Sequence, residues 1–357
     1  MTIESNDKTI YGIKTDAERY FWIGYLSTVV ISSLVGDVVI LVASKKSDVF
    51  KLNGFLIGLI QHIAISDLIM SVGYISPIIV SLVLEKWVFG DYIAYTHEFF
   101  AYSVFPVTNI LVCALTTSKY LMIRYRLQVP RWTKKKAHLA CGFLWISCVV
   151  FSFSLLIINK MDLRFDYTSY EVDFVRSKNY VWTYAGLTVG LLYCIPIVAV
   201  ILSSVLTFKF LLKARKISRR GGGTLRWQGM MAVLLTGIVY CVSSLPYTVY
   251  KMRRPFVPET PPGYFHIQFK RHSEYMTLLN VMANFYIYSL TVRSFRRFIW
   301  SKITMVTSHW LSCDRKNDLK TSTAMLNRNE TDSNPKQNNL DDITTERLRT
   351  CPLETTI

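Results

Sequence analysis

The chain has 357 residues, of which 51% are hydrophobic and 14% aromatic, and a chain this apolar is unlike an ordinary soluble protein of its size. Its formal net charge of +17 does not indicate a nucleic-acid partner, because the basic residues form short clusters between apolar runs. Composition and charge therefore predict a membrane protein that contacts lipid and binds no nucleic acid.

Seven apolar runs are long enough to cross a membrane, because a helix needs about 20 mostly apolar residues to span a hydrocarbon core of about 30 Å. In chain order they are residues 20–44, 55–84, 92–123, 139–158, 181–212, 230–250 and 274–292. Asn280, Asn284 and Ser289 make the seventh run the weakest. The predicted fold class is an all-α membrane protein, a seven-transmembrane helix bundle over residues 20–292.

The charges of the loops predict how the bundle is oriented. The loops after the third and fifth runs are rich in Lys and Arg and contain no acidic residue, whereas residues 160–180 carry both signs. Short basic loops stay in the cytoplasm. We therefore expect a plasma-membrane protein with an extracellular tail of residues 1–19 and a cytoplasmic C-terminus.

A short basic helix is predicted after the seventh run. In residues 293–303, "RSFRRFIWSKI", Phe295, Phe298 and Ile299 recur at helical spacing while basic side chains take the other faces. Such an amphipathic helix lies on the inner membrane surface, and a merely basic stop-transfer segment is the alternative. Residues 304–357 are polar, and we expect a disordered cytoplasmic tail.

Two features of this tail suggest modification or a partner. Cys313 follows the surface helix and is a candidate for palmitoylation, with an unmodified thiol as the alternative. The final residues 355–357, "TTI", fit a C-terminal ligand for a PDZ-domain protein.

Nearly every apolar run contains a short motif, and the order and spacing of these motifs match those of one known family. From about residue 20 to residue 303 the chain resembles the rhodopsin-like (class A) family of G-protein-coupled receptors. The matching motifs are Asp67 in "IAISDL", Trp87 in "WVFG", Tyr120 in "SKYLMIRYRL", Trp145, Pro196, Pro246 and "NFYIY" at 284–288.

The resemblance implies a function. It implies a receptor that binds an extracellular ligand, a peptide or a small polar molecule, and activates a heterotrimeric G protein by movement of the cytoplasmic ends of its helices. It also implies arrestin as a partner of the phosphorylated tail. No H-E-x-x-H or G-x-S-x-G motif indicates an enzyme.

Several residues depart from the family pattern. Asp37 stands where the family has asparagine, Ser118 and Lys119 replace its acid and arginine, Ser244 replaces a tryptophan, and Phe285 replaces the proline of the seventh helix. The predicted outer loops also lack a cysteine for the usual disulfide. These departures describe a divergent member.

A buried acidic cluster is expected around Asp67, because a carboxylate in mid-membrane needs polar partners. The resemblance implies a sodium-binding and activation cluster made of Asp67, Thr108, Asn280, Asn284 and Asp37. One alternative is a neutral aspartic acid that only joins helices, and another is a proton shared between Asp67 and Asp37. Beyond a sodium ion as an allosteric ligand, no cofactor or metal is expected.

Two prolines predict where the fifth and sixth helices bend. Pro196 and Pro246 interrupt the hydrogen bonds of the fifth and sixth helices and so predict hinges. Asn109 and Tyr240 occupy positions that are usually apolar in the family, and a hydrogen bond there is expected to stabilise one state.

The G-protein interface implied by the resemblance lies at the end of the third and seventh helices. Its residues are Lys119, Tyr120, Ile123, Leu127 and Tyr288. Lys119 keeps the positive charge of arginine without its planar fork, and Ser118 cannot form an ion pair with it. We expect a weaker resting restraint together with a weaker G-protein contact. In the alternative, Lys119 only reaches lipid headgroups.

The candidate ligand-binding residues are polar and lie near the outer ends of the helices. They are His97, Glu98, Tyr102, Glu274 and Tyr275, and together they suit a basic group of the ligand. Ala101 stands where amine receptors have an acid, and Leu278 where opsins have a lysine. In the alternative, these polar residues contact water and bind no ligand.

Two other functions stay open at this point. A non-signalling or arrestin-biased decoy receptor of the same fold is suggested by Ser118 and Lys119. A membrane transporter is the alternative of another class, although the chain shows none of the internal repeats expected of one.

Overall fold

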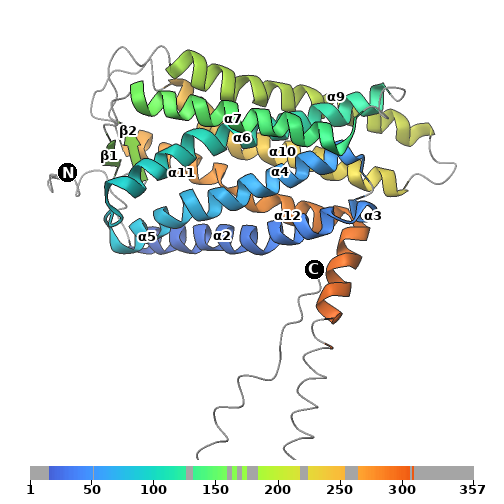
Figure 1. Ribbon diagram of the computed structural model, residues 1–357, viewed down its shortest axis with the longest axis horizontal. Helices are drawn as coiled ribbons and strands as arrows, with labels where there is room; N and C mark the ends of the chain where they lie inside the picture. Colours follow the sequence, from blue (N-terminus) through green and yellow to red (C-terminus); the bar gives the residue numbers. More distant parts are fainter. Residues whose placement is uncertain are drawn as a thin grey trace, which may run out of the picture. The chain divides into compact units, whose positions relative to one another are not determined.

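The computed structural model describes residues 16–50, 52–125, 132–158, 163–166, 171–174, 184–217, 224–253, 264–305 and residue 308. Contacts divide the chain into two units, Met1–Arg296 and Arg297–Ile357. In the first unit, long helices pack side by side (Figure 1).

The elements follow the predicted apolar runs. In chain order they are α2 (Asp16–Ser44), α3 (Ser47–Phe50), α4 (Gly54–Met70), η2 (Ser71–Ile75), α5 (Ser76–Leu84), α6 (Gly90–Arg124), α7 (Lys134–Ile158), β1 (Leu163–Asp166), β2 (Glu171–Phe174), η4 (Tyr184–Cys194), α9 (Ile195–Ile217), α10 (Thr224–Arg253), α11 (Tyr264–Thr277) and α12 (Leu279–Thr291). Residues 293–305 are also helical. The predicted helical fold class is confirmed.

Six helical segments of the described chain are long and apolar enough to cross a membrane. The seventh, made of α11 and α12, does not reach that standard, in keeping with its polar sequence. It is interrupted at Leu278, whose backbone N–H bonds the carbonyl of Tyr275 in a tight turn. We call the bundle end that holds Asp16 and Leu84 the predicted outer end, and the end that holds Ser44 and Arg124 the predicted inner end.

The second helix changes its winding because of a proline. Pro77 has no N–H to give to the preceding turn, and the helix widens to π geometry over Ser71–Ile75. Both the backbone N–H and the hydroxyl of Ser76 donate to the carbonyl of Ser71, five residues back. The predicted run 55–84 is therefore one continuous span with a local expansion.

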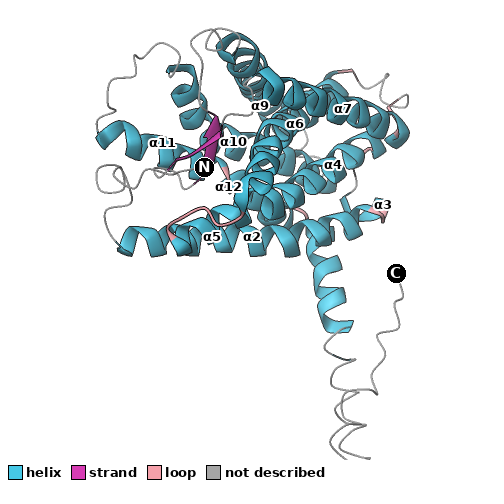
Figure 2. Ribbon diagram, turned by 60° about the vertical axis from the view of Figure 1, so that its left-hand side comes forward, coloured by secondary structure: helices cyan, strands magenta, loops and turns pink. Residues whose placement is uncertain are grey.

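A short hairpin that the sequence analysis did not predict lies at one end of the bundle in Figure 1 and is coloured magenta in Figure 2. β1 and β2 pair antiparallel, with Leu163 opposite Phe174 and Asp166 opposite Glu171. Both strands fall inside the loop of mixed charge.

Ion pairs connect three helices at the predicted outer end. Arg271 of α11 is fully buried and pairs with Glu18 of α2, and Arg19 pairs with Glu85 at the end of α5. The five cysteines among the described residues are all unpaired. In this part of the chain, ion pairs and not disulfides join the outer ends of the helices.

A close helix contact involves the residue that replaces the family's proline. A Cβ atom built on Gly36 of α2 would lie 2.5 Å from the Cβ of Phe285 and 2.7 Å from its Cγ. Neither atom is at the free end of a flexible side chain, so only glycine fits here.

Gly36→Ala is therefore expected to destabilise the protein by about 1–3 kcal/mol, because overpacking forces the helices apart. In thermal unfolding of the purified protein, Tm should fall by about 2–10 °C. The loss should shrink in a Phe285→Gly background. Gly24→Ala is the matched control, because a Cβ there meets nothing within 4 Å; an equal loss in both variants would contradict the contact.

Candidate functional site

Two carboxyl groups are buried in the middle of the bundle. Asn284 of α12 donates its side-chain N–H to Oδ2 of Asp67 at 2.9 Å, and Ser33 donates its hydroxyl to Oδ2 of Asp37 at 2.5 Å. The two carboxyl groups are close enough to interact electrostatically. Oδ1 of each, and Oδ1 of Asn284, has no hydrogen-bond partner among the described residues. Three buried oxygens thus remain available to a cation or a proton.

Two expected members of this cluster have other contacts. The hydroxyl of Thr108 donates to Ser66 and to the carbonyl of Val104, both at 3.1 Å, rather than to Asp67. Asn280 lines a separate cavity. The structure therefore brings together Asp67, Asn284 and Asp37, and the expected Thr108–Asp67 contact is absent.

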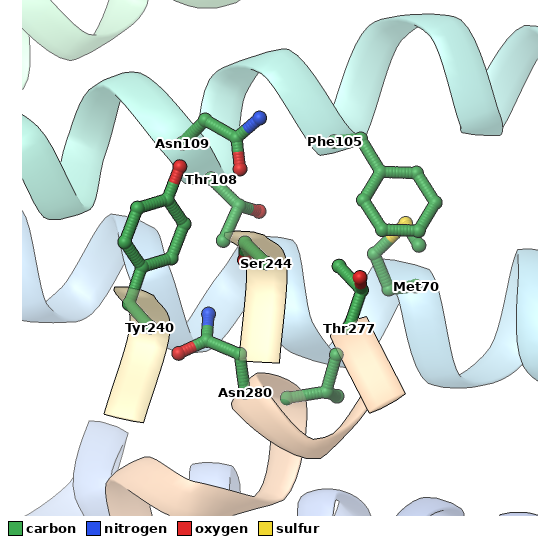
Figure 3. A pocket seen from close by; sticks show the side chains of 9 residues that line it. Met70, Phe105, Thr108, Asn109, Tyr240, Ser244, Thr277 and Asn280 are labelled. Atoms are coloured by element: carbon green, nitrogen blue, oxygen red, sulfur yellow. The ribbon is translucent and has the colours of Figure 1, made fainter. Parts of the chain in front are cut away.

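A small cavity lies between α4, α6, α10, α11 and α12, and Figure 3 shows the side chains that converge on it. It encloses about 10 Å³, close to the least that one water molecule needs. The Tyr240 hydroxyl, the Ser244 hydroxyl and Oδ1 of Asn280 are buried there without a hydrogen-bond partner in the described part of the chain. Ser244, where the family often has tryptophan, leaves this space open.

Asn109 and Tyr240 do not bond to each other in this structure. Pro196 has no N–H for the carbonyl of Leu192, four residues earlier, and the side chain of Asn109 donates to that carbonyl at 3.3 Å. Asn109 therefore joins α6 to the fifth helix at its proline. That helix is π-wound over Tyr184–Cys194, directly before Ile195 begins α9.

The sixth helix, α10, packs tightly against its neighbours on the inner side of Pro246. A Cβ built on Gly237 would lie 2.7 Å from the Ser204 hydroxyl of α9 and 3.1 Å from a methyl carbon of Thr116 of α6. At Gly237, α10 therefore lies in close contact with both α6 and α9.

The expected G-protein residues differ in exposure. Lys119 is buried, with 9% of its surface exposed, which disfavours the alternative in which it reaches lipid headgroups. Tyr120 and Ile123 are half-buried, and Arg124 donates to the Tyr120 hydroxyl at 2.8 Å. Tyr288 is buried, with its ring 5.3 Å from that of Phe50.

Leu127 and Cys313 lie outside the described residues. The expected roles of these two positions therefore stay predictions.

Two of the expected ligand residues are packed into aromatic clusters. His97 stacks on Tyr74 with ring centroids 4.6 Å apart, and Tyr275 meets Trp22 at 4.9 Å. Tyr275 belongs to a buried hydrophobic cluster that also contains Trp22 and Tyr74, and His97 packs against this cluster through Tyr74. The contacts of Tyr275 explain its burial without a ligand, whereas both ring nitrogens of His97 are buried without a hydrogen-bond partner among the described residues.

The other three lie on the inward-facing sides of α6 and α11. Glu98 is buried, 3.9 Å from Nδ1 of His97. Tyr102 packs against Val189 of the fifth helix. Glu274 is buried in α11, and its Oε1 accepts a hydrogen bond of 2.9 Å from the Tyr247 hydroxyl.

The surroundings of Glu274 were not predicted. Tyr247 follows Pro246 directly, and the ammonium of Lys251 lies 4.9 Å from the centre of the Tyr247 ring. Oε2 of Glu274 has no hydrogen-bond partner among the described residues. One turn further inward, the Thr277 hydroxyl donates to the carbonyl of Ser243 at 3.3 Å. Glu274 and Thr277 thus join α11 to α10 on both sides of the proline.

The helices, the buried polar cluster and the proline-containing sixth helix define a multi-pass membrane protein built as a receptor bundle. The chain belongs to the 7 transmembrane receptor family (rhodopsin family), whose family model matches residues 38–288, more than half of its length. A search of curated proteins found no similar sequence. Proteins of this family are signalling receptors and not enzymes, so membership favours a receptor over a transporter.

Proposed function

We propose that this protein is a plasma-membrane receptor with its N-terminus outside and its C-terminus in the cytoplasm. It binds an extracellular ligand that carries a basic group and activates a heterotrimeric G protein. The observation that carries this proposal is the carboxyl group of Glu274, which is 2% exposed and has one oxygen bound by Tyr247 and the other without a partner.

A buried carboxylate with an unused oxygen favours a cationic partner, because burying an uncompensated charge is costly. An ammonium or guanidinium group would bind Oε2 while Tyr247 keeps Oε1. On the third helix, Ala101 provides no acid where amine receptors have one, and the buried acid that α6 does carry, Glu98, lies 3.9 Å from Nδ1 of His97. The ligand is therefore a basic peptide or a small polar cation that depends on Glu274.

The position of Tyr247 connects ligand binding to the sixth helix. Because Tyr247 follows Pro246, a change in its bond to Glu274 acts at the point where α10 lacks a backbone hydrogen bond. A shift there is transmitted along α10 to Gly237, whose contacts hold the inner half closed. Opening would expose Lys119 and Tyr120 to the G protein.

A ligand screen tests this function. Cells that express the chain are exposed to basic peptides and small cations, and second messengers and arrestin recruitment are recorded together. The proposal expects an agonist that raises a second messenger in the wild-type chain and has far less effect on Glu274→Gln. Agonists that act equally on both would contradict it.

The arrestin-biased or non-signalling decoy is the second candidate. It is favoured by Ser118, which provides no carboxylate beside Lys119 at the predicted inner end. In the same screen, agonists that recruit arrestin or bind without any second-messenger response would support the decoy. The predicted arrestin, PDZ-domain and palmitoylation sites all fall in the tail, outside the described residues.

We propose that a sodium ion binds the oxygens near Asp67. Oδ1 of Asp37, Asp67 and Asn284 are acceptors of the type that hard cations bind. We expect sodium to lower agonist affinity in the wild-type chain and to have no such effect in Asp67→Asn, measured by competition binding over a sodium titration. Ser66→Ala, which removes a partner of Thr108 but no carboxylate, is the control. No effect of sodium on the wild-type chain would contradict a sodium site and leave the two alternatives, a neutral Asp67 that joins helices or a proton shared between Asp67 and Asp37.

A further inference from the structure

Two histidines from different helices meet near the predicted inner end of the bundle. Nε2 of His62 in α4 lies 3.0 Å from Nδ1 of His138 in α7, and the ring centroids are 5.2 Å apart. Neither residue belongs to the acidic cluster, the hinge or the ligand site. The pair therefore needs its own explanation.

The helices that carry the pair are held close together. A Cβ atom built on Gly58 would lie 2.7 Å from the Cβ of Ala137. Gly58 is one turn before His62, and Ala137 directly precedes His138. A site on two tightly packed helices keeps its geometry better than a site on loops.

The spacing of the two nitrogens matches what a metal ion requires. Zinc binds imidazole nitrogen at about 2.0–2.1 Å, so two such nitrogens around a tetrahedral ion are about 3.3 Å apart. From this geometry we infer that His62 and His138 form a binding site for a divalent transition-metal ion, for which Zn²⁺ is the representative. Imidazole is a preferred ligand of Zn²⁺, Cu²⁺ and Ni²⁺.

Water completes the coordination. Within the described residues, no group of three or more His, Cys, Asp or Glu side chains is placed to hold a metal. The protein therefore supplies two ligands. Because His138 is exposed and lies one turn after Lys134, near the predicted inner end, we expect water to supply the other positions. Each ring must offer the lone pair of one nitrogen to the metal ion. The proton that forms the hydrogen bond between His62 and His138 therefore moves to the other nitrogen of its own ring. The bound ion connects α4 to α7.

The test uses the full chain in lipid nanodiscs with ZnCl₂ or, for comparison, MgCl₂. Saturating Zn²⁺ is expected to raise Tm by about 2–4 °C, because a ligand that binds only the folded state stabilises it. It should also protect His138 from diethyl pyrocarbonate, measured by mass spectrometry. His272 is the reference, because it is exposed at the other end of the bundle.

Variants separate this site from other ions. His62→Gln and His138→Gln should each abolish the rise in Tm, whereas His272→Gln should keep it. If His62→Gln does not fold, His138→Gln is tested instead. His138 is exposed, so its substitution should leave the fold intact. No rise with Zn²⁺ in the wild-type chain would mean that the pair is only a hydrogen bond. An unchanged rise in both variants would mean that the ion binds elsewhere.

Discussion

Glu274→Gln is expected to lower the potency of a cationic agonist by roughly 30- to 700-fold, which corresponds to about 2–4 kcal/mol. The buried carboxylate is the only charge that this substitution removes, and glutamine has nearly the same shape. The Tyr247 hydroxyl can still donate to the amide oxygen, so the local fold should persist. Concentration–response curves of the second messenger measure the shift.

Glu85→Gln is the matched control for this prediction. Glu85 is also an acid at the predicted outer end, but it pairs with Arg19 and is not placed between α10 and α11. The potency of the agonist on Glu85→Gln should stay within about threefold of its wild-type value, because exposed ion pairs contribute little to stability. Equal losses in the two variants would mean that overall negative charge attracts the ligand and that Glu274 does not bind it.

Gly237→Val is expected to raise signalling in the absence of ligand. The new side chain would overlap the hydroxyl of Ser204 and the methyl carbon of Thr116 while α10 is closed. Overpacking of this kind costs about 1–3 kcal/mol, and movement of α10 away from its neighbours relieves it. The ratio of open to closed receptor should rise by roughly 5- to 150-fold, depending on how fully α10 moves. Basal nucleotide exchange on a purified G protein measures the change.

Two variants control for damage to the fold. Gly142→Val places the same side chain in α7, where a built Cβ meets nothing within 4 Å, and it should leave basal exchange unchanged. Gly237→Ala should give a smaller rise, because the Ser204 hydroxyl can rotate away from a single methyl group. If Gly237→Val folds and reaches the surface but signals like Gly142→Val, closure of α10 is not what limits activity.

Most of the helices could be predicted because their information is local. A run such as 139–158 is apolar over the length of a membrane, and no other part of the chain is needed to interpret it. The weakness of the seventh run was predicted for the same reason, since Asn280 and Asn284 dilute it. Both asparagines are buried in the structure.

Some irregularities had a local signal without a unique outcome. Pro77 and Pro196 each predict a lost hydrogen bond, but not that the helix would widen to π geometry. The bond from Asn109 to the carbonyl of Leu192 follows once the gap left by Pro196 and the packing of α6 are both known. The strands at 163–166 and 171–174 alternate apolar and charged residues, a pattern that the charge of the loop obscured.

Contacts between distant parts of the chain had no sequence signal. Arg271 and Glu18 are 253 positions apart, and nothing in the sequence of either segment indicates that the two residues pair. The same holds for His62 and His138, and for Gly36 and Phe285. Of the candidate ligand residues, Glu274 was predicted from its polarity, but its link to Tyr247 depends on how α10 and α11 pack.

The proposed receptor requires that the chain cross the membrane an odd number of times, so that Glu274 lies in the outer half of the bundle and Lys119 in the cytosolic half. Six crossings are well supported by length and apolarity, and α11 with α12 must supply the seventh. The direct measurement is antibody access to epitope tags at the two termini in intact and permeabilised cells. The account predicts that the N-terminal tag is labelled in intact cells and the C-terminal tag only after permeabilisation. Labelling of both tags under the same condition would contradict it.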